Sequence, residues 1–317
     1  MAESSAGVSL VTKPAWSGTL PANAHLTDDS VSIGGAAINV SIEGAEFNLP
    51  STSMVRWIRE SACAVTEYYG RFPVQHLRIE VRHLQTGRGV IFGRTVISAG
   101  IPTITVQLGE STSASNLRDD WIMTHEMVHL AFPSVADEHH WIEEGIATYV
   151  EPVARAQIGD LPAEKVWRDL VDGTKKGLPA PGDQGLDNTR TWGRTYWGGA
   201  LFCLIADVEI NRRTNNAHGL QDALRAIVRA GGNMEKDWSL TRTLKIGDDA
   251  TGVPVLTELY NQMKGKPVTP DLAAFWHALG VQTSGDSVVF DQTAPYASVV
   301  RSIVASRSVR DAACLEI

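Results

Sequence analysis

Residues 125–129 read H-E-x-x-H, a pattern that restricts the structure of this chain more than any other segment does. In an α-helix, side chains four positions apart lie one above the other, so His125 and His129 point the same way. Two imidazoles at this spacing can bind one zinc ion, while Glu126 lies beside the zinc-bound water as its general base. The pattern therefore predicts a metal-binding helix with His125 and His129 as ligands.

The residues around this motif favour a buried helix. Asn116 and Asp119 resemble a capping box at its start, and Pro133 predicts that it stops at Phe132. Apolar residues surround the helix on nearly every side, at Leu117, Trp121, Ile122, Met123, Met127, Val128, Leu130, Ala131 and Phe132. Burying two histidines and a glutamate there costs free energy unless a partner such as a metal compensates. The alternative is a chance match, with both histidines as hydrogen-bonded core residues.

Catalytic zinc normally has three protein ligands and one open position, so the sequence must supply a third ligand. The metzincin pattern requires a glycine three residues and a histidine six residues after the second histidine. This sequence has Phe132 and Val135 at those positions, which excludes the metzincin arrangement. The next candidate lies in residues 141–151, where an apolar stripe at helical spacing leaves Glu144 on another face. The alternative is that Glu144 is a solvated surface carboxylate.

Residues 141–151 resemble the W-x-x-E-G-x-A-x-Y segment of the gluzincin zinc peptidases, particularly the aminopeptidase N and glycyl aminopeptidase families. In those families the glutamate before the glycine is the third zinc ligand, which implies Glu144 here and one Zn²⁺ per chain. Glu144 follows His129 by 144 − 129 = 15 residues, a shorter connection than aminopeptidase N relatives have. Gly145 costs about 1 kcal/mol relative to alanine in a helix, so we expect it to allow a close approach to the first metal helix.

A second resemblance covers residues 195–214, which look like the helix of the glycyl aminopeptidase-like family that begins with Y-x-x-G. Residues 219–225 fit the continuation of that segment. In the aminopeptidase N families, the tyrosine of this region donates a hydrogen bond to the oxyanion of the tetrahedral intermediate, which implies that role for Tyr196. The alternative is an aromatic side chain packed at a helix start. Arg194 is a further candidate in the same region.

The same resemblance implies a substrate-binding strand before the metal helix. In the gluzincin families an edge strand binds the substrate backbone by strand addition, and residues 101–108 are the candidate here. The G-x-M-E-N motif, whose glutamate holds the free amino terminus in the aminopeptidase N family, is absent from this sequence. Aminopeptidase and endopeptidase action therefore both stay open. Hydrolysis of a free-amine peptide and of its acetylated twin would separate them.

The remaining chain predicts an α+β fold. Alternating or short apolar segments indicate strands at 31–33, 37–42, 77–82, 96–97, 104–108 and 288–290, with turns at 87–93. Helical spacing indicates helices at 52–69, 161–171, 224–228, 256–263 and 272–279. With the resemblance, this order predicts a thermolysin-like catalytic domain in which a small mixed β-sheet is followed by a mainly helical C-terminal lobe.

The chain divides into three expected parts. Residues 1–50 form an N-terminal β segment packed on the catalytic domain, and 51–155 form the α/β zinc-binding subdomain. Residues 156–317 form a helical subdomain that closes the active-site cleft, with a long loop at 177–188. His139 and His140 lie just before the helix that carries Glu144. Each of them could line the cleft, act as an alternative metal ligand, or be a surface residue without a catalytic role.

Composition and charge limit the classes of partner that this chain can bind. A net charge of −8 in 317 residues argues against a nucleic-acid surface, and no apolar run reaches the length of a membrane span. Cys63, Cys203 and Cys314 form no metal motif and allow at most one disulfide. They are expected to be small core residues, with an exposed position near the terminus as the alternative for Cys314, which lies outside the residues described below. The first residues lack the features of a signal peptide, so the compartment stays open. A soluble protein that is secreted or periplasmic, with its signal peptide absent from this chain, is one interpretation.

The predicted activity is zinc-dependent hydrolysis of a peptide or protein substrate. Glu126 takes the proton of the metal-activated water and passes it to the leaving amine, and Tyr196 stabilises the oxyanion. One alternative is a zinc hydrolase that acts on a non-peptide amide or an ester. Another is a catalytically inactive, peptide-binding relative, although an intact Glu126 argues against that because a scaffold needs no base. The oligomeric state is not predicted.

Overall fold

A computed structural model of the chain describes residues 29–43, 49–285 and 287–305. Among these residues, five strands form a mixed sheet in the order β1-β2-β3-β5-β4. The β2–β3 and β3–β5 pairs are parallel, and the β1–β2 and β4–β5 pairs are antiparallel. The strands are β1 (Asp29–Ile33), β2 (Ala36–Glu43), β3 (His76–Leu84), β4 (Val90–Ser98) and β5 (Ile101–Gly109).

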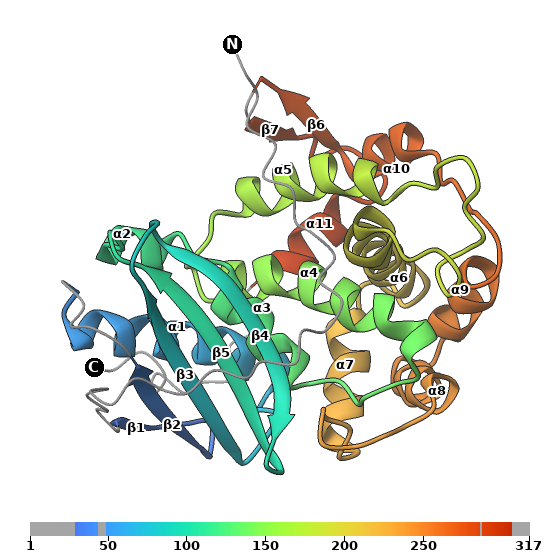
Figure 1. Cartoon of the computed structure of the whole chain (residues 1–317). Helices are drawn as coiled ribbons and strands as arrows, with labels where there is room; N and C mark the ends of the chain where they lie inside the picture. Colours follow the sequence, from blue (N-terminus) through green and yellow to red (C-terminus); the bar gives the residue numbers. More distant parts are fainter. Residues whose placement is uncertain (1–28, 44–48, 286, 306–317) are drawn as a thin grey trace.

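The sheet buries one face because its strands alternate apolar and polar side chains. Along the middle of β2, β3 and β5 the inward side chains are buried, at Ile38, Val40, Ile79, Val81, Ile104 and Val106. Helix α1 (Ser51–Tyr69) packs behind the sheet (Figure 1) and ends at Gly70, whose φ of 77° suits glycine. The strands predicted at 31–33, 37–42 and 77–82 and the helix predicted at 52–69 are confirmed.

The metal helix is shorter than predicted. The segment expected to form one helix to Phe132 forms two, α2 (Ala114–Arg118) and α3 (Ile122–His129). The Asn116–Asp119 capping box was wrong: Asn116 instead pairs with Ser113 to cap α2. Asp120 then starts α3, because its carboxylate accepts the N–H groups of Ile122 and Met123 at 3.1 and 3.0 Å.

The strand that was expected to lie at the sheet edge is internal. Residues 101–108 belong to β5, which pairs with β3 on one side and β4 on the other. β4 is the edge strand next to α3, and it begins at Val90, inside the segment that was predicted as turns. Strand order depends on contacts between distant segments, so the local alternation of residues could not identify the edge.

The remainder is mainly helical, as predicted, and lies beside the sheet (Figure 1). Its α-helices are α4 (His140–Gln157), α5 (Ala163–Thr174), α6 (Gly199–Arg213), α7 (Leu220–Arg229), α8 (Leu240–Thr251), α9 (Val255–Met263), α10 (Leu272–Leu279) and α11 (Ala297–Val304). Short helical turns cover Asp137–His139 and Lys175–Gly177, and a π-helix covers Gly193–Gly198. A hairpin of β6 (Val281–Ser284) and β7 (Ser287–Phe290) follows α10.

Helix α4 crosses α6 at a contact between two glycines. A Cβ on Gly145 would lie 2.8 Å from the carbonyl oxygen of Gly199, and a Cβ on Gly199 would lie 2.7 Å from the Cα of Gly145. The expectation that Gly145 allows an approach to the first metal helix was therefore wrong: its partner is α6. The contact fixes the start of α4, where Glu144 lies. Among the described residues, no helix is both long and apolar enough to cross a membrane.

Candidate metal centre

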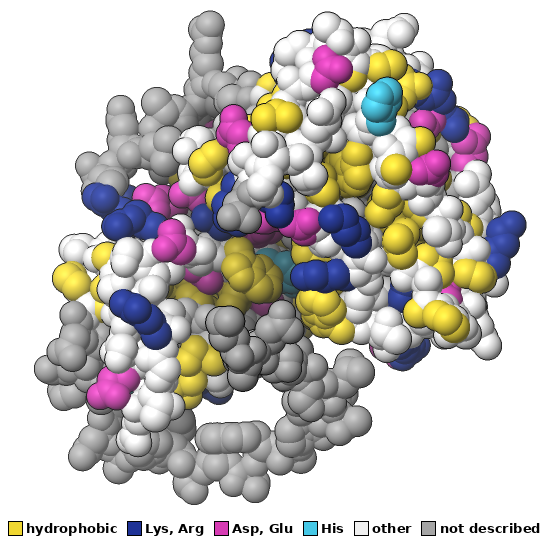
Figure 2. Space-filling model, turned by 90° about the horizontal axis from the view of Figure 1, so that it is seen from above, with side chains coloured by type: hydrophobic (Ala, Val, Ile, Leu, Met, Phe, Trp, Pro, Cys, Tyr) yellow, Lys and Arg dark blue, Asp and Glu magenta, His cyan; other side chains and the backbone are white. Residues whose placement is uncertain are grey.

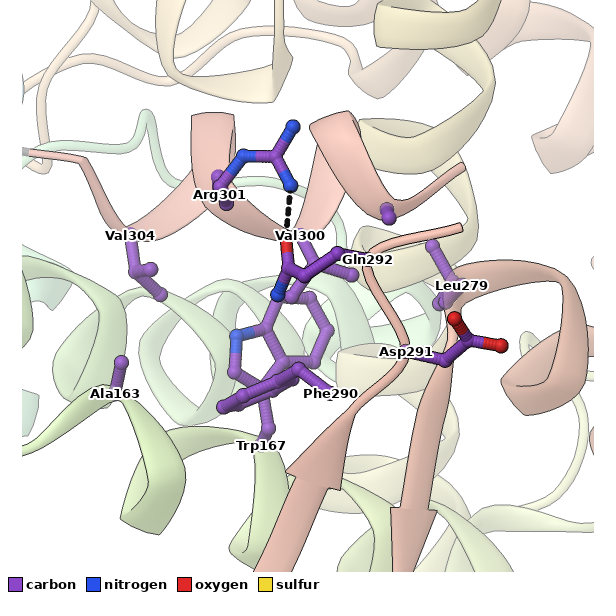
Figure 3. Close-up of a pocket in the computed structure, with 10 residues that line it drawn as sticks. Ala163, Trp167, Leu279, Phe290, Asp291, Gln292, Val300, Arg301 and Val304 are labelled. Carbon is purple, nitrogen blue, oxygen red and sulfur yellow. Dashed lines mark hydrogen bonds between the residues drawn. The ribbon is translucent and has the colours of Figure 1, made fainter. Parts of the chain in front are cut away.

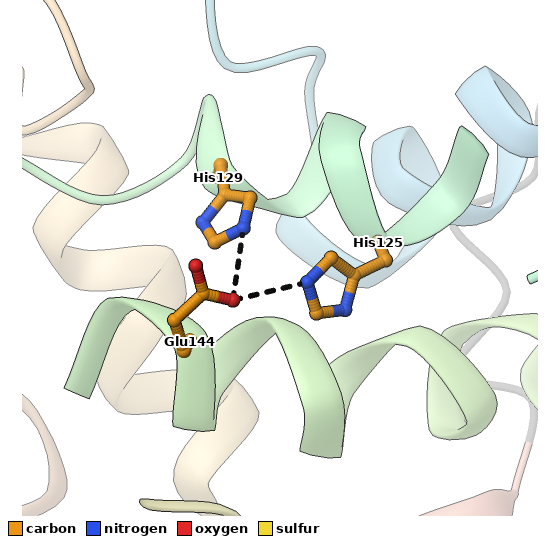
Figure 4. Close-up of side chains that lie close together, drawn as sticks. All are labelled: His125, His129 and Glu144. Atoms are coloured by element: carbon orange, nitrogen blue, oxygen red, sulfur yellow. Dashed lines mark hydrogen bonds and ion pairs between the residues drawn. The ribbon is translucent and has the colours of Figure 1, made fainter. Parts of the chain in front are cut away.

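Three predicted ligands meet between α3 and α4 (Figure 4). The Nε2 atoms of His125 and His129 lie 3.2 and 3.5 Å from the Oε2 atom of Glu144, and the three ligand atoms lie within 4.8 Å of one another. Tetrahedral zinc with bonds of about 2.0–2.2 Å separates its ligand atoms by roughly 3.4 Å. Two imidazole nitrogens and a carboxylate oxygen are also a donor set that zinc accepts, so these residues fit the ion.

Helix geometry and helix packing bring the three side chains together. His125 and His129 lie one turn apart on α3, with ring centroids 5.0 Å apart. Glu144 lies near the start of α4, which packs against α3. Figure 2 shows a recess between the sheet and the helical part, with a histidine on its floor and lysine and arginine side chains on its border.

The electrostatic attraction between Glu144 and the two histidines shifts the pKa of Glu144 and that of His129. Burial alone would raise the pKa of Glu144, but His129 and His125 outweigh it and hold that pKa well below its usual range. Burial alone would lower the pKa of His129, but the adjacent Glu144 carboxylate raises it to about 9. Glu144 therefore stays an anion in this buried place, where a metal cation can replace the proton on His129.

The side chain of Glu126 is held next to the sheet edge. It is 8% exposed, and its Oε2 atom accepts a hydrogen bond of 2.6 Å from the hydroxyl of Thr95 on β4. Gly93 leaves room for it, since a Cβ there would lie 2.8 Å from the Glu126 Cγ. Thr95 and Gly93 were not predicted as site residues. Their i, i+2 spacing on a strand was the signal, but residues up to 93 were predicted to form turns.

Tyr196 lies at the same centre. Its ring is stacked against the His125 ring, with centroids 6.3 Å apart and an interplanar angle of 18°. Burial raises its pKa above the usual value, and the charges of Glu144 and Glu126 raise it further. The phenol therefore stays protonated at neutral pH and can donate a hydrogen bond. The ring of Trp192, 42% exposed, is also stacked against Tyr196, with centroids 6.1 Å apart.

The other sequence candidates divide between the centre and the long loop. His140 Nε2 lies 3.4 Å from Glu144 Oε1, so His140 borders the centre. His139 instead pairs with Asp187 at 3.0 Å. Arg194 also contacts the loop, because it forms a buried ion pair of 2.7 Å with Asp183. His139 and Arg194 thus hold the loop at 177–188.

A separate cavity of about 80 Å³ lies under α5, α10, β7 and α11 (Figure 3). Its lining is mainly apolar and includes Trp167, Leu279 and Val300, with Arg301 donating to Gln292 at one side. None of the candidate metal or catalytic residues lines it. This cavity is therefore separate from the place between α3 and α4 where the three predicted ligands meet.

Comparisons with known proteins show the fold. No family model matches the chain, and no curated protein matches it. Among solved structures, an aminopeptidase N family protein from Idiomarina loihiensis matches with a TM-score of 0.56 and 12% identity, covering 81% of this chain and 49% of its own. An M1 zinc metallopeptidase from Deinococcus radiodurans matches with a TM-score of 0.51 and 18% identity, covering 78% and 52%.

The same Deinococcus enzyme, as a mutant bound to the substrate Tyr-Ser-Ala, matches with a TM-score of 0.51 and 17% identity, covering 78% of this chain and 53% of its own. This chain therefore spans about half the length of these structures. The likeness confirms an α+β fold, with a five-stranded sheet and a mostly helical remainder, that is similar to the fold of M1 zinc metallopeptidases.

Proposed function

We propose that this chain is a zinc-dependent peptide hydrolase of the gluzincin type with a thermolysin-like catalytic domain. The observation that carries the proposal is the convergence of His125, His129 and Glu144 at distances that fit zinc, with Glu126 beside them. The fold neighbours support it, since they are zinc metallopeptidases and one of them holds a peptide substrate. We assign one Zn²⁺ per chain to the three ligands.

The catalytic roles follow from position and protonation state. Zinc bound at this centre supplies an activated water and a Lewis acid for the scissile carbonyl. Glu126 accepts the proton from the water and returns it to the leaving amine. Tyr196, which is protonated and stacked beside His125, donates a hydrogen bond to the oxygen on which negative charge develops.

The substrate of this proposal is an extended peptide lying along β4. β4 is the edge strand beside α3, so one row of its backbone groups is free of a neighbouring described strand. A peptide can add to such an edge through main-chain hydrogen bonds. In this proposal, the described helical residues that follow α4 form the opposite wall of the cleft and contribute Tyr196 and Trp192. The proposal therefore assigns substrate binding to β4 instead of to residues 101–108, which were the first candidate.

The proposal is tested by Glu126→Gln, which keeps the size of the side chain and removes the base. We expect this variant to keep one zinc per chain and to lose about 10²- to 10⁴-fold in kcat toward a peptide substrate, because general base catalysis contributes that much. Zinc content and peptide hydrolysis are measured together. Glu110→Gln, a change at an exposed glutamate, serves as the control. Undiminished hydrolysis by Glu126→Gln would remove Glu126 as the base.

A further inference from the structure

The hydroxyl of Thr95 contacts both ends of the Glu126 residue. Thr95 Oγ1 lies 2.6 Å from the carboxylate oxygen Oε2 and 2.9 Å from the backbone carbonyl oxygen of the same residue. The shorter contact is typical of a hydroxyl that donates to a charged carboxylate. One side chain of the sheet edge therefore restrains the position of the carboxylate relative to its own backbone.

The end of α3 explains why this carbonyl is available. The N–H of Leu130 donates to the carbonyl of Met127, three residues back, so the last turn of the helix is tightened. The Glu126 carbonyl is one of the last four in α3, which need partners from outside the helix. The Thr95 hydroxyl lies beside this carbonyl from β4, and it shares its one proton between the helix carbonyl and the carboxylate.

The sequence of β4 is suited to this close approach. Gly93 and Thr95 are two residues apart, so they face the same side of the strand, toward α3. A Cβ on Gly93 would crowd Ile122 and lie 2.9 Å from Glu126 Oε1. Glycine at 93 therefore brings the strand near the carboxylate, and threonine at 95 holds it. The base is fixed by the strand that we assign to substrate binding.

We propose that Thr95 is a positioning residue that orients the carboxylate of Glu126 for proton transfer. This inference rests on the proposed function. The Thr95 hydroxyl occupies Oε2, which leaves Oε1 as the oxygen that takes the proton. Because the contact acts on the base and not on the metal ligands, loss of the hydroxyl lowers turnover and leaves zinc binding and peptide affinity almost unchanged.

The test compares Thr95→Val, which has the shape of threonine without its hydroxyl, with Thr95→Ser, which keeps the hydroxyl. Thr95→Val is expected to lose roughly 10- to 100-fold in kcat, as for a hydrogen bond to a charged group. Its KM and its zinc content should stay within about threefold of wild type. Thr95→Ser should retain most of the turnover. Thr95→Ala against Thr95→Ser gives the same comparison if the valine variant does not fold.

A second readout does not depend on turnover. A phosphinic analogue of the best peptide substrate, which imitates the transition state, should bind Thr95→Val roughly 10- to 100-fold more weakly by calorimetry, matching the loss in kcat. The matched control is Thr105→Val on the neighbouring strand β5, which removes a contact of 3.3 Å between Thr105 and Glu80 and should change neither quantity.

Two results would overturn the positioning role. One is a kcat for Thr95→Val within threefold of wild type, with zinc bound. The other is an equal loss in the serine and valine variants, which would show that the hydroxyl is not responsible. Either result leaves the proposed function standing if Glu126→Gln is inactive. A fully active Glu126→Gln would instead refute the proposed function itself.

Discussion

Single side chains behind the metal helix form a buried network of charges. Glu151 on α4 is 7% exposed and forms an ion pair of 2.9 Å with Arg155, which also contacts Asp160 at 2.6 Å. Burial raises the pKa of Glu151 to about 7, outweighing the stabilising charge of Arg155, while Asp120 and Asp169 raise it further. Asp120 is the residue that caps α3, so this network adjoins the start of the metal helix.

The raised pKa of Glu151 predicts a pH dependence of stability. Between its ordinary pKa of 4.5 and its folded pKa of about 7, the native state binds more protons at this site than the unfolded state does. The contribution of Glu151 to the free energy of unfolding therefore falls as pH rises through this window. We expect Glu151→Gln to remove that fall.

Urea unfolding at pH 5 and pH 8 measures this effect. The free energy of unfolding should drop more for wild type than for Glu151→Gln between the two pH values. Glu164→Gln, at an exposed glutamate of α5, is the control and should follow wild type. Parallel pH dependences for wild type and Glu151→Gln would show that Glu151 ionises in the native state as it does in the unfolded chain.

Whole elements were predicted best where local signals agree. The helix α1 and the strand β3 follow directly from residue spacing, and Gly70 marks the end of α1. The break between α2 and α3 was not predicted, because Asp119 and Asp120 suit a first helical turn as well as a cap. The partner of Gly145 could not be predicted either, since one sequence does not say which helix will cross α4.

The contact between α4 and α6 predicts that replacing Gly145 by alanine lowers the free energy of unfolding. An exposed helical glycine normally gains stability when it is replaced by alanine. Gly145→Ala should instead lower the free energy of unfolding by about 1–3 kcal/mol, because its Cβ would overlap Gly199. Chemical denaturation measures the change, and Gly265→Ala, where a Cβ meets nothing within 4 Å, is the control. Greater stability of Gly145→Ala would contradict the close packing.

The whole molecule combines segments that are far apart in the sequence. The centre takes two histidines from α3, a glutamate from α4 and a tyrosine from the π-helix, while the sheet edge supplies Thr95. The motif and its resemblance predicted the three residues that meet at the centre, because the spacing of the histidines and the segment around Glu144 are local properties of the sequence. Thr95 could not be found in the same way, since its role depends on β4 lying outside β5 in the sheet.

The most direct test of the account is the zinc content per chain after dialysis against a weak chelator. We predict one zinc in wild type and in Glu143→Ala, which removes the neighbouring carboxylate. Glu144→Ala should bind zinc more than about 100-fold more weakly, because even changes in residues that only hydrogen-bond a ligand cost about 10- to 100-fold. Folded wild-type protein that binds no added zinc, or equal binding by Glu144→Ala, would contradict the site formed by His125, His129 and Glu144.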